Sequence, residues 1–511
     1  MQKDWISKVK GKSAVELFLT LFVFVLGFGV RIYDLTDPPL DFHATRQLRS
    51  AIIARSFFYE LEASKIPESE TVENAVKLAS LEVYEPPIME RIMSWMDVIL
   101  GQEYFWVGRI FSAFFWTLGG FFIYRMGRKF ASRFAVICSL LVYFFLPFSV
   151  TASRSIQPDP WMCSWIVITA FTLYRWMEKP IPIRFFFAIL AGGFTILIKV
   201  FAAFFVGFML LGCLIASFQR KNGLRIIMQG ISMGALMLFP SLLYYLVLNP
   251  SRSGDFFSFW VISLSGLILT SKFYASWIAL IKGLTGLILP LLAVWGVFLA
   301  EKKTLGLLLG WWTGYLMYGL VVPYQIITHE YYSLILVPLI TISLIPLLDI
   351  LFRKMETLHF IRRVGIYSII LLTAGYGAFV SCGSLRATSY ALEPASWRKV
   401  AQAIPEDSSF IALTSDYGLR LIYYGWRAPD ASWPDSKDTA LFNLAGRGNY
   451  DFSSFFQAQT ENKDFFLVTV ANELDAQPEL KTRLSALPVF FEGNGFTIYD
   501  LRKSSADDKQ K

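Results

Sequence analysis

Long apolar runs alternate with short charged linkers from residue 14 to residue 384 of this chain. A helix of about 20 mostly apolar residues is long enough to cross a lipid bilayer. Such runs begin near residues 14, 104, 134, 161, 184, 201, 226, 277, 304, 332 and 364. The pattern predicts a polytopic α-helical membrane protein with about eleven transmembrane helices.

The cations in the linkers predict how the chain is oriented. Clusters of Lys and Arg occupy every second linker, at residues 3–12, 125–133, 175–184, 220–225, 302–303 and 353–363. The linkers between them hold only isolated cations, at Arg154, Lys199, Arg252 and Lys272. Because cytoplasmic loops carry the excess of Lys and Arg, we expect the N-terminus in the cytoplasm. An odd number of spans then places the C-terminal segment on the opposite side.

The first long segment on the predicted outer side comprises residues 34–103. Within it, residues 45–59 place apolar side chains at helical spacing, with arginines at other positions. This pattern is typical of an amphipathic helix that lies in the membrane interface. A second such helix is expected at residues 89–100, with Trp95 as an interfacial anchor. We therefore expect an extracytoplasmic loop that carries two interfacial helices.

The second long segment, residues 385–511, differs sharply from the rest in composition. Buried strands are expected at residues 410–414, 465–470 and 497–499, and a helix at residues 474–487. The polar tail at residues 502–511 is expected to be disordered. The sequence thus predicts a transmembrane domain over residues 1–384 and a soluble extracytoplasmic α/β domain over residues 385–511.

Composition agrees with this picture and excludes other classes. Hydrophobic residues make up 55% of the chain and charged residues 17%, whereas soluble domains carry nearer a quarter of charged residues. The formal net charge of +8 resides in the linkers, which argues against a nucleic-acid-binding stripe. The four cysteines fall in apolar segments and form no disulfide framework. The outer segments hold no usable N-glycosylation sequon, which favours a bacterial inner membrane.

Ionisable residues outside the cytoplasmic clusters gather on the predicted outer face. Such residues are costly near membrane depth and therefore suggest function. They form five separate clusters along the chain, and their convergence predicts one site at the outer membrane interface. The residues singled out in these clusters, with one neighbouring tyrosine, are Asp41, His43, Arg46, Glu85, Arg154, Asp159, Lys199, His329, Glu330 and Tyr332.

Each of these residues also has a purely structural alternative. Asp41 could be the N-cap of the helix that follows it, because Asp is a preferred cap. Arg154 and Lys199 could extend toward lipid headgroups. His329 and the tyrosines after it could form an interfacial aromatic belt. The double prolines at residues 38–39 and 86–87 could simply terminate and orient segments.

The order of the motifs carries a resemblance to a known family. The motifs are Asp41 in the loop with amphipathic helices, Glu85-Pro86-Pro87, Arg154-x-x-x-Pro158-Asp159, Lys199 after the fifth span, and His329-x-Tyr331-Tyr332. Over about residues 14–350 the chain resembles the membrane-embedded glycosyltransferases of the GT-C superfamily. It is most similar to the glycosyltransferase family 39-like branch, alongside protein O-mannosyltransferases and the aminoarabinose transferase of lipid A.

The resemblance implies a fold, a donor and a reaction. The implied donor is a sugar on a polyprenyl phosphate, and an acceptor hydroxyl attacks its anomeric carbon with inversion. Asp41 matches the catalytic carboxylate, which takes the proton of the acceptor hydroxyl. The departing phosphate needs cations and hydrogen-bond donors to stabilise its developing charge. For this role the resemblance suggests Lys199, Arg46, Arg154, His329 and Tyr332, with His43 and Glu330 as further candidates.

One position departs from the family. The protein O-mannosyltransferases carry an Asp-Glu pair in the first loop, whereas here Phe42 follows Asp41. This departure weakens the expectation of a protein acceptor and leaves a glycan or a lipid open. Glu85 or Asp159 could supply a second carboxylate, and either could bind a divalent metal ion. The ligand pattern specifies no metal, and no other cofactor is expected.

Two other functions stay open at the level of sequence. The chain could be a transporter or flippase of lipid-linked sugars, or a non-catalytic scaffold for envelope assembly. Transporters usually show internal repeats and polar residues near the bilayer midplane, and neither pattern is present. The sequence therefore favours a glycosyltransferase at the periplasmic face of an inner membrane. Its expected partners are the lipid donor, an acceptor and membrane lipids, without nucleic acid.

Overall fold

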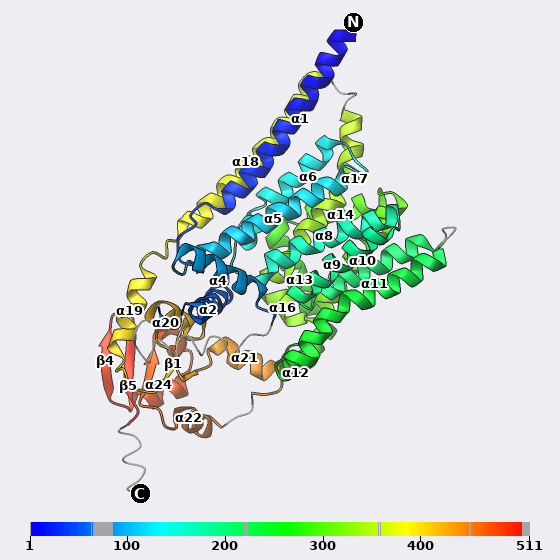
Figure 1. Cartoon of the computed structure of the whole chain (residues 1–511). Coiled ribbons are helices and arrows are strands. Elements are labelled where there is room, and N and C mark those ends of the chain that lie inside the picture. Colours follow the sequence, from blue (N-terminus) through cyan, green and yellow to red (C-terminus); the bar gives the residue numbers. More distant parts are fainter. Residues whose placement is uncertain are drawn as a thin grey trace. The chain divides into compact units, whose positions relative to one another are not determined.

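The computed structural model describes residues 2–62, 64, 85–218, 223–355, 357, 359–448 and 451–502, shown in Figure 1. The chain forms two compact units, each assembled from three stretches of sequence. Unit 1 comprises residues 1–35, 84–86 and 108–388, and unit 2 comprises residues 36–83, 87–107 and 389–511. The predicted disordered tail lies outside the described residues, apart from Arg502.

Unit 1 is built almost entirely from helices. Its α-helices are α1 (Gln2–Arg31), α5 (Trp106–Gly127), α6 (Arg133–Phe145), α7 (Pro147–Ser153), α8 (Pro158–Glu178), α9 (Pro182–Ile198), α10 (Ala202–Ser217), α11 (Gly223–Leu243), α12 (Pro250–Phe257), α13 (Ser271–Thr285), α14 (Ile288–Phe298), α15 (Lys302–Val321), α16 (Pro323–Thr328), α17 (Leu336–Met355) and α18 (Phe360–Ala387). Short π- and 3₁₀-helical turns lie at η2 (Tyr244–Leu248), η3 (Ser258–Ile262), η4 (Ser265–Leu269) and η5 (Glu330–Ser333).

Several of these helices are long and apolar enough to cross a membrane. In the described part of the chain there are four: residues 106–127, 223–248, 330–355 and 360–387. The number rises to six if two bent pairs, at residues 133–153 and 254–285, each count as one span. Other predicted spans fall on apolar helices of fewer than 18 residues, such as α9, α10 and α14. A multi-span helical fold is therefore present, while the number eleven stays a prediction.

Helices α10 and α15 approach each other closely because their contact is lined with glycine. Gly306, Gly310 and Gly314 recur at every fourth position of α15 and therefore lie on one face. A Cβ added at Gly310 would clash with the backbone of Phe208 on α10, and one at Gly212 with that of Gly306. Small residues at this spacing are typical of helix pairs that pack backbone to backbone in membranes.

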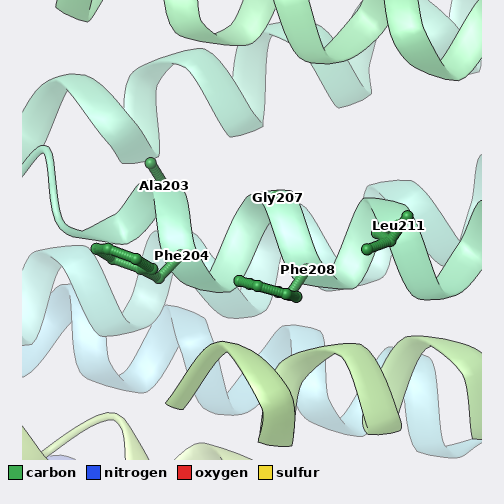
Figure 2. A pocket seen from close by; sticks show the side chains of 5 residues that line it. All are labelled: Ala203, Phe204, Gly207, Phe208 and Leu211. Atoms are coloured by element: carbon green, nitrogen blue, oxygen red, sulfur yellow. The ribbon is translucent and has the colours of Figure 1, made fainter. Parts of the chain in front are cut away.

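Two apolar cavities that share lining residues form a groove along this helix pair. Figure 2 shows its first part, a cavity of about 250 Å³ lined by Ala203, Phe204, Gly207, Phe208 and Leu211 of α10. A second cavity of about 530 Å³ shares two of these residues and continues between α10 and α15 as far as Lys302. The lining of both cavities is otherwise almost wholly apolar. The groove follows α10 over nearly its whole length.

The end of α1 is fixed to unit 1 by a buried arginine. Arg31 has no exposed surface and donates to Ser153 Oγ at 2.6 Å, to the Gly27 carbonyl at 2.7 Å and to the Phe144 carbonyl at 3.0 Å. The next turn of chain is also held, since Arg109 donates to the carbonyl of Leu35 at 2.9 Å. Helix α1 also lies beside α18, as Figure 1 shows.

Unit 2 contains a five-stranded mixed sheet in the order β2-β1-β3-β5-β4. The strands are β1 (Phe410–Leu413), β2 (Ala431–Ser432), β3 (Phe465–Val468), β4 (Val489–Gly493) and β5 (Phe496–Asp500). Strands β2, β1 and β3 are parallel, and β5 is antiparallel to both β3 and β4. The three predicted strands are confirmed as β1, β3 and β5. The single helix predicted at residues 474–487 is replaced by two helices, α23 (Ala471–Asp475) and α24 (Pro478–Ser485). The second helix begins at Pro478, because proline cannot continue a preceding helix.

The remaining helices of unit 2 include both helices of the predicted outer loop. They are α2 (Ala44–Leu61), α4 (Ile88–Leu100), α19 (Glu393–Ala403), η6 (Ser415–Gly418), α20 (Leu419–Gly425), α21 (Ser436–Leu444) and α22 (Phe452–Thr460). The structure thus groups parts of residues 34–103 with the C-terminal segment. The predicted boundary after residue 384 stays a prediction about which parts fold independently.

Helix α2 is present as predicted, but it does not present its apolar face to a membrane interface. Leu48 and Ile52 are at most 2% exposed and lie in one core with Trp397 and Phe410. The polar side is also covered, because Arg55 donates to Glu103 and to the carbonyl of Tyr423. The interfacial placement of this helix was therefore wrong, since the C-terminal segment supplies the apolar surface that covers it. Helix α4 does keep Trp95 exposed, at 55%.

Candidate active site

Lys199 and Asp159 form a buried ion pair in unit 1. Lys199 follows the last residue of α9 in extended conformation, and its side chain is 2% exposed. Its Nζ donates to Asp159 Oδ1 at 2.8 Å and lies 3.9 Å from Glu85 Oε1. Asp159 lies in the first turn of α8, directly after Pro158 at the first helical position. A carboxylate is favourable there because the helix N-terminus carries partial positive charge.

Aromatic rings complete the surroundings of the Lys199 ammonium. Its Nζ lies 4.6 Å from the ring centroid of Tyr332 and 5.4 Å from that of Tyr331. The ring of Tyr332 stacks on Tyr318 of α15, with centroids 5.8 Å apart and an interplanar angle of 10°. The imidazole of His329 lies 6.1 Å from Tyr332. A desolvated ammonium gains about 2 kcal/mol from such rings, which helps to offset its burial.

The structure therefore brings together four of the predicted site residues, Glu85, Asp159, Lys199 and Tyr332, with His329 beside them. Neither Lys199 nor Asp159 extends to solvent, so the headgroup alternative for Lys199 is wrong. Glu330 begins the 3₁₀ turn that also holds the tyrosines. These residues come from separate elements that the packing of α8, α9 and α15 places side by side.

Arg154 lies elsewhere in the polar network of unit 1. Its side chain is 1% exposed, and Nη2 donates to the carbonyl of Asp34 at 2.8 Å. Asp34 follows α1 with a φ of 52°, a left-handed conformation that is uncommon for a residue other than glycine. Arg154 thus has a clear structural partner, and its predicted role at a donor phosphate stays a prediction.

Three of the predicted site residues, Asp41, His43 and Arg46, belong to unit 2. Helix α2 begins at Ala44, and its N-cap is His43, with a φ of 47°. Asp41 precedes this cap position, so the N-cap alternative for Asp41 is wrong. The half-buried Asp41 instead accepts a hydrogen bond on Oδ1 from Gln47 Nε2 at 2.9 Å. Gln47 is fully buried and also donates to the carbonyl of Phe42, which fixes the loop around the carboxylate.

Further residues of unit 2 surround this loop and were not predicted. Burial raises the pKa of Tyr390, and the charge of Asp41 acts on it in the same direction. The backbone N–H of Tyr390 donates to Asp37 at 3.0 Å, and Thr45 donates to Asp416 at 2.7 Å. These partners lie some 350 residues or more from the loop in sequence. No local pattern could have predicted them.

A metal site is not evident from side-chain positions. Among the described residues, no three His, Cys, Asp or Glu side chains gather as a shared ligand set would. Glu85 and Asp159 both approach Lys199, so an ammonium occupies the place between these two carboxylates. The predicted use of either carboxylate for a divalent ion stays a prediction.

A family model and several solved structures are similar to this chain. Residues 84–245 match the family model of the dolichyl-phosphate-mannose-protein mannosyltransferases. This region includes Glu85, Asp159 and Lys199, but it is less than half of the chain. No curated protein sequence matches the chain.

Solved structures match over nearly the whole chain. ArnT from Cupriavidus metallidurans, bound to undecaprenyl phosphate, has a TM-score of 0.60 at 14% identity, over 94% of this chain and 97% of that protein. The oligosaccharyltransferase AglB from Archaeoglobus fulgidus, in complex with an inhibitory peptide and a dolichol-phosphate, has a TM-score of 0.60 at 12% identity, over 96% of this chain and 75% of that one. The chain therefore has the fold of the GT-C membrane glycosyltransferases that its motifs resemble.

Proposed function

We propose that this protein is a membrane glycosyltransferase that moves a sugar from a polyprenyl-phosphate donor to an acceptor hydroxyl. The observation that carries the proposal is the buried Lys199, held by Asp159 and Glu85 and faced by Tyr331 and Tyr332, in a chain with the GT-C fold. Solved structures of this fold contain undecaprenyl phosphate or a dolichol-phosphate. We place the reaction at the periplasmic face of a bacterial inner membrane, on the basis of the charge pattern.

In this proposal Lys199 binds the donor phosphate and stabilises its departure. An ammonium has three donors, and the hydrogen bond to Asp159 uses one of them. In surroundings of low polarity, a positive charge stabilises a developing anion far more than it would in water. Hydrogen bonds from His329 and Tyr332 would act on the same phosphate. Arg46 and Arg154 are also proposed as contacts of the donor phosphate, with His43 and Glu330 as further candidates.

Asp41 is the proposed general base. The acceptor hydroxyl becomes nucleophilic as its proton passes to the carboxylate, and attack opposite the phosphate inverts the anomeric centre. The hydrogen bond from Gln47 orients the carboxylate and uses only Oδ1 of the two oxygens. A carboxylate with two oxygens has further lone pairs to accept the proton.

The groove on α10 and α15 offers a place for the isoprenoid tail of the donor. Its cavities are lined almost wholly by apolar side chains and by the backbone of glycines. Ala203, at one end, follows Lys199 by four residues in the sequence. A lipid bound with its phosphate at Lys199 could therefore lay its tail along α10. The proposed partner is accordingly an undecaprenyl-type phosphate that carries a sugar.

The experiment that tests the proposal is donor turnover by Asp41→Asn. The full-length protein in nanodiscs would be given undecaprenyl-phosphate-linked sugars together with a bacterial envelope extract that supplies acceptor hydroxyls, and release of undecaprenyl phosphate would be measured. Asn keeps an oxygen that can accept from Gln47, so thermal stability should stay close to that of the parental protein. Loss of the base should lower turnover by roughly 10²- to 10⁴-fold. Parental turnover in a folded variant would contradict the assignment of Asp41.

The same assay separates the other two functions from this one. A flippase would move the lipid-linked sugar between leaflets without releasing undecaprenyl phosphate. A scaffold would do neither. Release that depends on Asp41 is expected from a glycosyltransferase alone.

A further inference from the structure

Two buried polar atoms near Lys199 have no partner in the described part of the chain. They are the hydroxyl of Tyr318 and the second carboxylate oxygen, Oδ2, of Asp159. Both side chains are fully buried, with no exposed surface. The ring of Tyr318 stacks on that of Tyr332, which faces the Lys199 ammonium, and this ammonium donates to Asp159. Buried polar groups almost always have hydrogen-bond partners, because each unpaired group costs free energy.

The two atoms make complementary demands on a ligand. An ionised Asp159 Oδ2 only accepts hydrogen bonds, whereas the Tyr318 hydroxyl can donate one. A phosphodiester oxygen could accept from Tyr318, but it has no proton to donate to the carboxylate. A ligand hydroxyl satisfies both, because it donates its proton to the carboxylate and accepts from the phenol. We propose that Tyr318 and Asp159 bind a hydroxyl group of the sugar being transferred, and that Tyr318 is a specificity-determining residue; this inference rests on the proposed function.

The ring of Tyr318 is held firmly in position for this role. It stacks on Tyr332, whose ring also faces the Lys199 ammonium. It makes an edge-to-face contact with Phe205, with centroids 5.2 Å apart. Tyr318 thus lies in the same cluster as Lys199, the proposed phosphate contact. This cluster also contains Asp159 Oδ2, to which Lys199 does not donate.

The chain offers a matched control on the same helix. Tyr315 lies three residues before Tyr318 and is also buried, at 2% exposed. Its hydroxyl is satisfied, because Trp277 donates to it at 3.2 Å and Ser333 lies 3.0 Å away. Tyr315→Phe leaves these partners unpaired and should lower thermal stability. Tyr318→Phe removes an unpaired hydroxyl and should leave thermal stability unchanged or raise it.

The test compares the two variants with sugar-loaded and sugar-free lipid. The full chain in nanodiscs would be titrated with undecaprenyl phosphate and with undecaprenyl phosphate carrying mannose, glucose, galactose or arabinose. Tyr318→Phe should bind undecaprenyl phosphate as the parental protein does. It should bind the best of the four loaded lipids about tenfold more weakly, the usual effect of losing one neutral hydrogen bond. Tyr315→Phe should keep the parental ratio between loaded and sugar-free lipid.

A second measurement identifies the ligand group. The ligands would be deoxy analogues of the best loaded lipid, each lacking one sugar hydroxyl. The parental protein should bind one of these analogues more weakly than the unmodified donor. Tyr318→Phe should bind that analogue and the unmodified donor equally well. Equal weakening of loaded and sugar-free lipid in Tyr318→Phe would overturn the inference and assign Tyr318 to the phosphate. No weakening of either would also overturn it, since the two atoms would then share only a buried water. A parental protein that binds no polyprenyl phosphate at all would overturn the proposed function as well.

Discussion

At the scale of single residues, the ion pair of Lys199 and Asp159 determines how the site can be tested. Taking two charges out of water costs more than their attraction usually returns, so a buried pair adds little stability. Removing one partner is different, because the other charge is then buried without compensation. Asp159 has no exposed surface. Replacing Lys199 alone would therefore change stability and donor binding together, and the two effects could not be told apart.

A double-mutant cycle separates the two effects. Lys199→Ala should lower the free energy of unfolding by about 3–5 kcal/mol, since it leaves the buried Asp159 without its cation. Asp159→Asn should lower it less, because Lys199 then keeps Glu85 at 3.9 Å. The double variant should recover much of that loss, because the only charge then left in the cluster is that of Glu85, which is partly exposed. Donor turnover should be lost in all three, as none keeps the ammonium beside its carboxylate. Thermal unfolding and release of undecaprenyl phosphate would be measured side by side.

A matched control for this cycle is Lys272→Ala, an isolated cation on the same predicted side that is exposed at the start of α13. It should change neither stability nor turnover. A double variant that is stable and turns over donor at the parental rate would remove Lys199 from the mechanism. Single variants as stable as the parental protein would instead show that the pair is not buried in solution.

Residue identities could be predicted from the sequence, but their partners could not. Glu85, Asp159, Lys199 and Tyr332 were selected because charged and polar groups near membrane depth are costly. That Lys199 binds Asp159, 40 residues earlier, depends on how α8 and α9 pack. Tyr318 was not selected at all, because a tyrosine within an apolar helix gives no signal until its neighbours are known.

At the scale of elements, helix α4 carries an acidic group whose charge state depends on pH. Burial raises the pKa of Asp97 from 3.8 to about 7. The backbone N–H of Tyr104, which donates to Asp97 at 3.0 Å, lowers this pKa, and the charge of Glu103 raises it. Between about pH 4 and pH 7 the folded state keeps a proton that the unfolded state has released. Stability should therefore fall as the pH rises through this range.

Asp97→Asn tests this dependence, because Asn is neutral and keeps an oxygen for the N–H of Tyr104. Hydrogen exchange of α4 amides in the full chain, compared between variant and parental protein at pH 5 and pH 8, reports the local stability. The parental protein should lose protection at the higher pH relative to the variant. Equal protection of the two proteins at both pH values would show that Asp97 titrates near its ordinary value.

The groove along α10 gives a second prediction at this scale. Gly207 is exposed in the groove of Figure 2, and a Cβ at this position would meet nothing within 4 Å. Gly207→Leu should therefore fill the groove without disturbing the helix. If the donor tail lies there, affinity for undecaprenyl phosphate should fall, while affinity for a short-chain polyprenyl phosphate should change less. Binding in detergent or nanodiscs measures both.

Gly375→Leu is the matched control, since Gly375 of α18 also has open space around it and belongs to a different helix. It should leave both affinities unchanged. Equal affinity of parental protein and Gly207→Leu for the long lipid would show that the tail lies elsewhere.

Element types were predicted better than their surroundings. Strands β1, β3 and β5 follow from short runs of buried apolar residues, and α2 from its helical spacing. The apolar face of α2 was assigned to the membrane because nothing nearby in sequence covers it. Trp397 and Phe410, which do cover it, come more than 300 residues later. An amphipathic pattern shows that one face of a helix is buried. Which residues cover that face depends on long-range packing.

At the scale of the whole molecule, this chain shares its fold with proteins whose sequences differ widely from its own. ArnT shares 14% identity with this chain and still matches over 94% of it. Apolar periodicity and linker charge define such a helical fold, and many side chains satisfy both. The residues expected to take part in the reaction occupy only a few positions, and the resemblance to the glycosyltransferases was found at those positions. Each unit is also assembled from three separate stretches of sequence, which a linear domain boundary cannot express.

The last prediction concerns the orientation of the whole chain in the membrane. Reporters fused after Lys129, which follows α5, and after Lys354, in the last turn of α17, should give a cytoplasmic signal. A reporter fused after Ser384, near the end of α18, should give an external signal. The reason is that Lys and Arg gather in every second linker, and each such cluster resists translocation. Alkaline phosphatase, active only outside, and a fluorescent protein that matures only inside would give opposite signals at each site. A cytoplasmic signal after Ser384 would contradict the odd number of spans. It would also place the residues of unit 2, Asp41 among them, on the side where the proposed reaction does not occur.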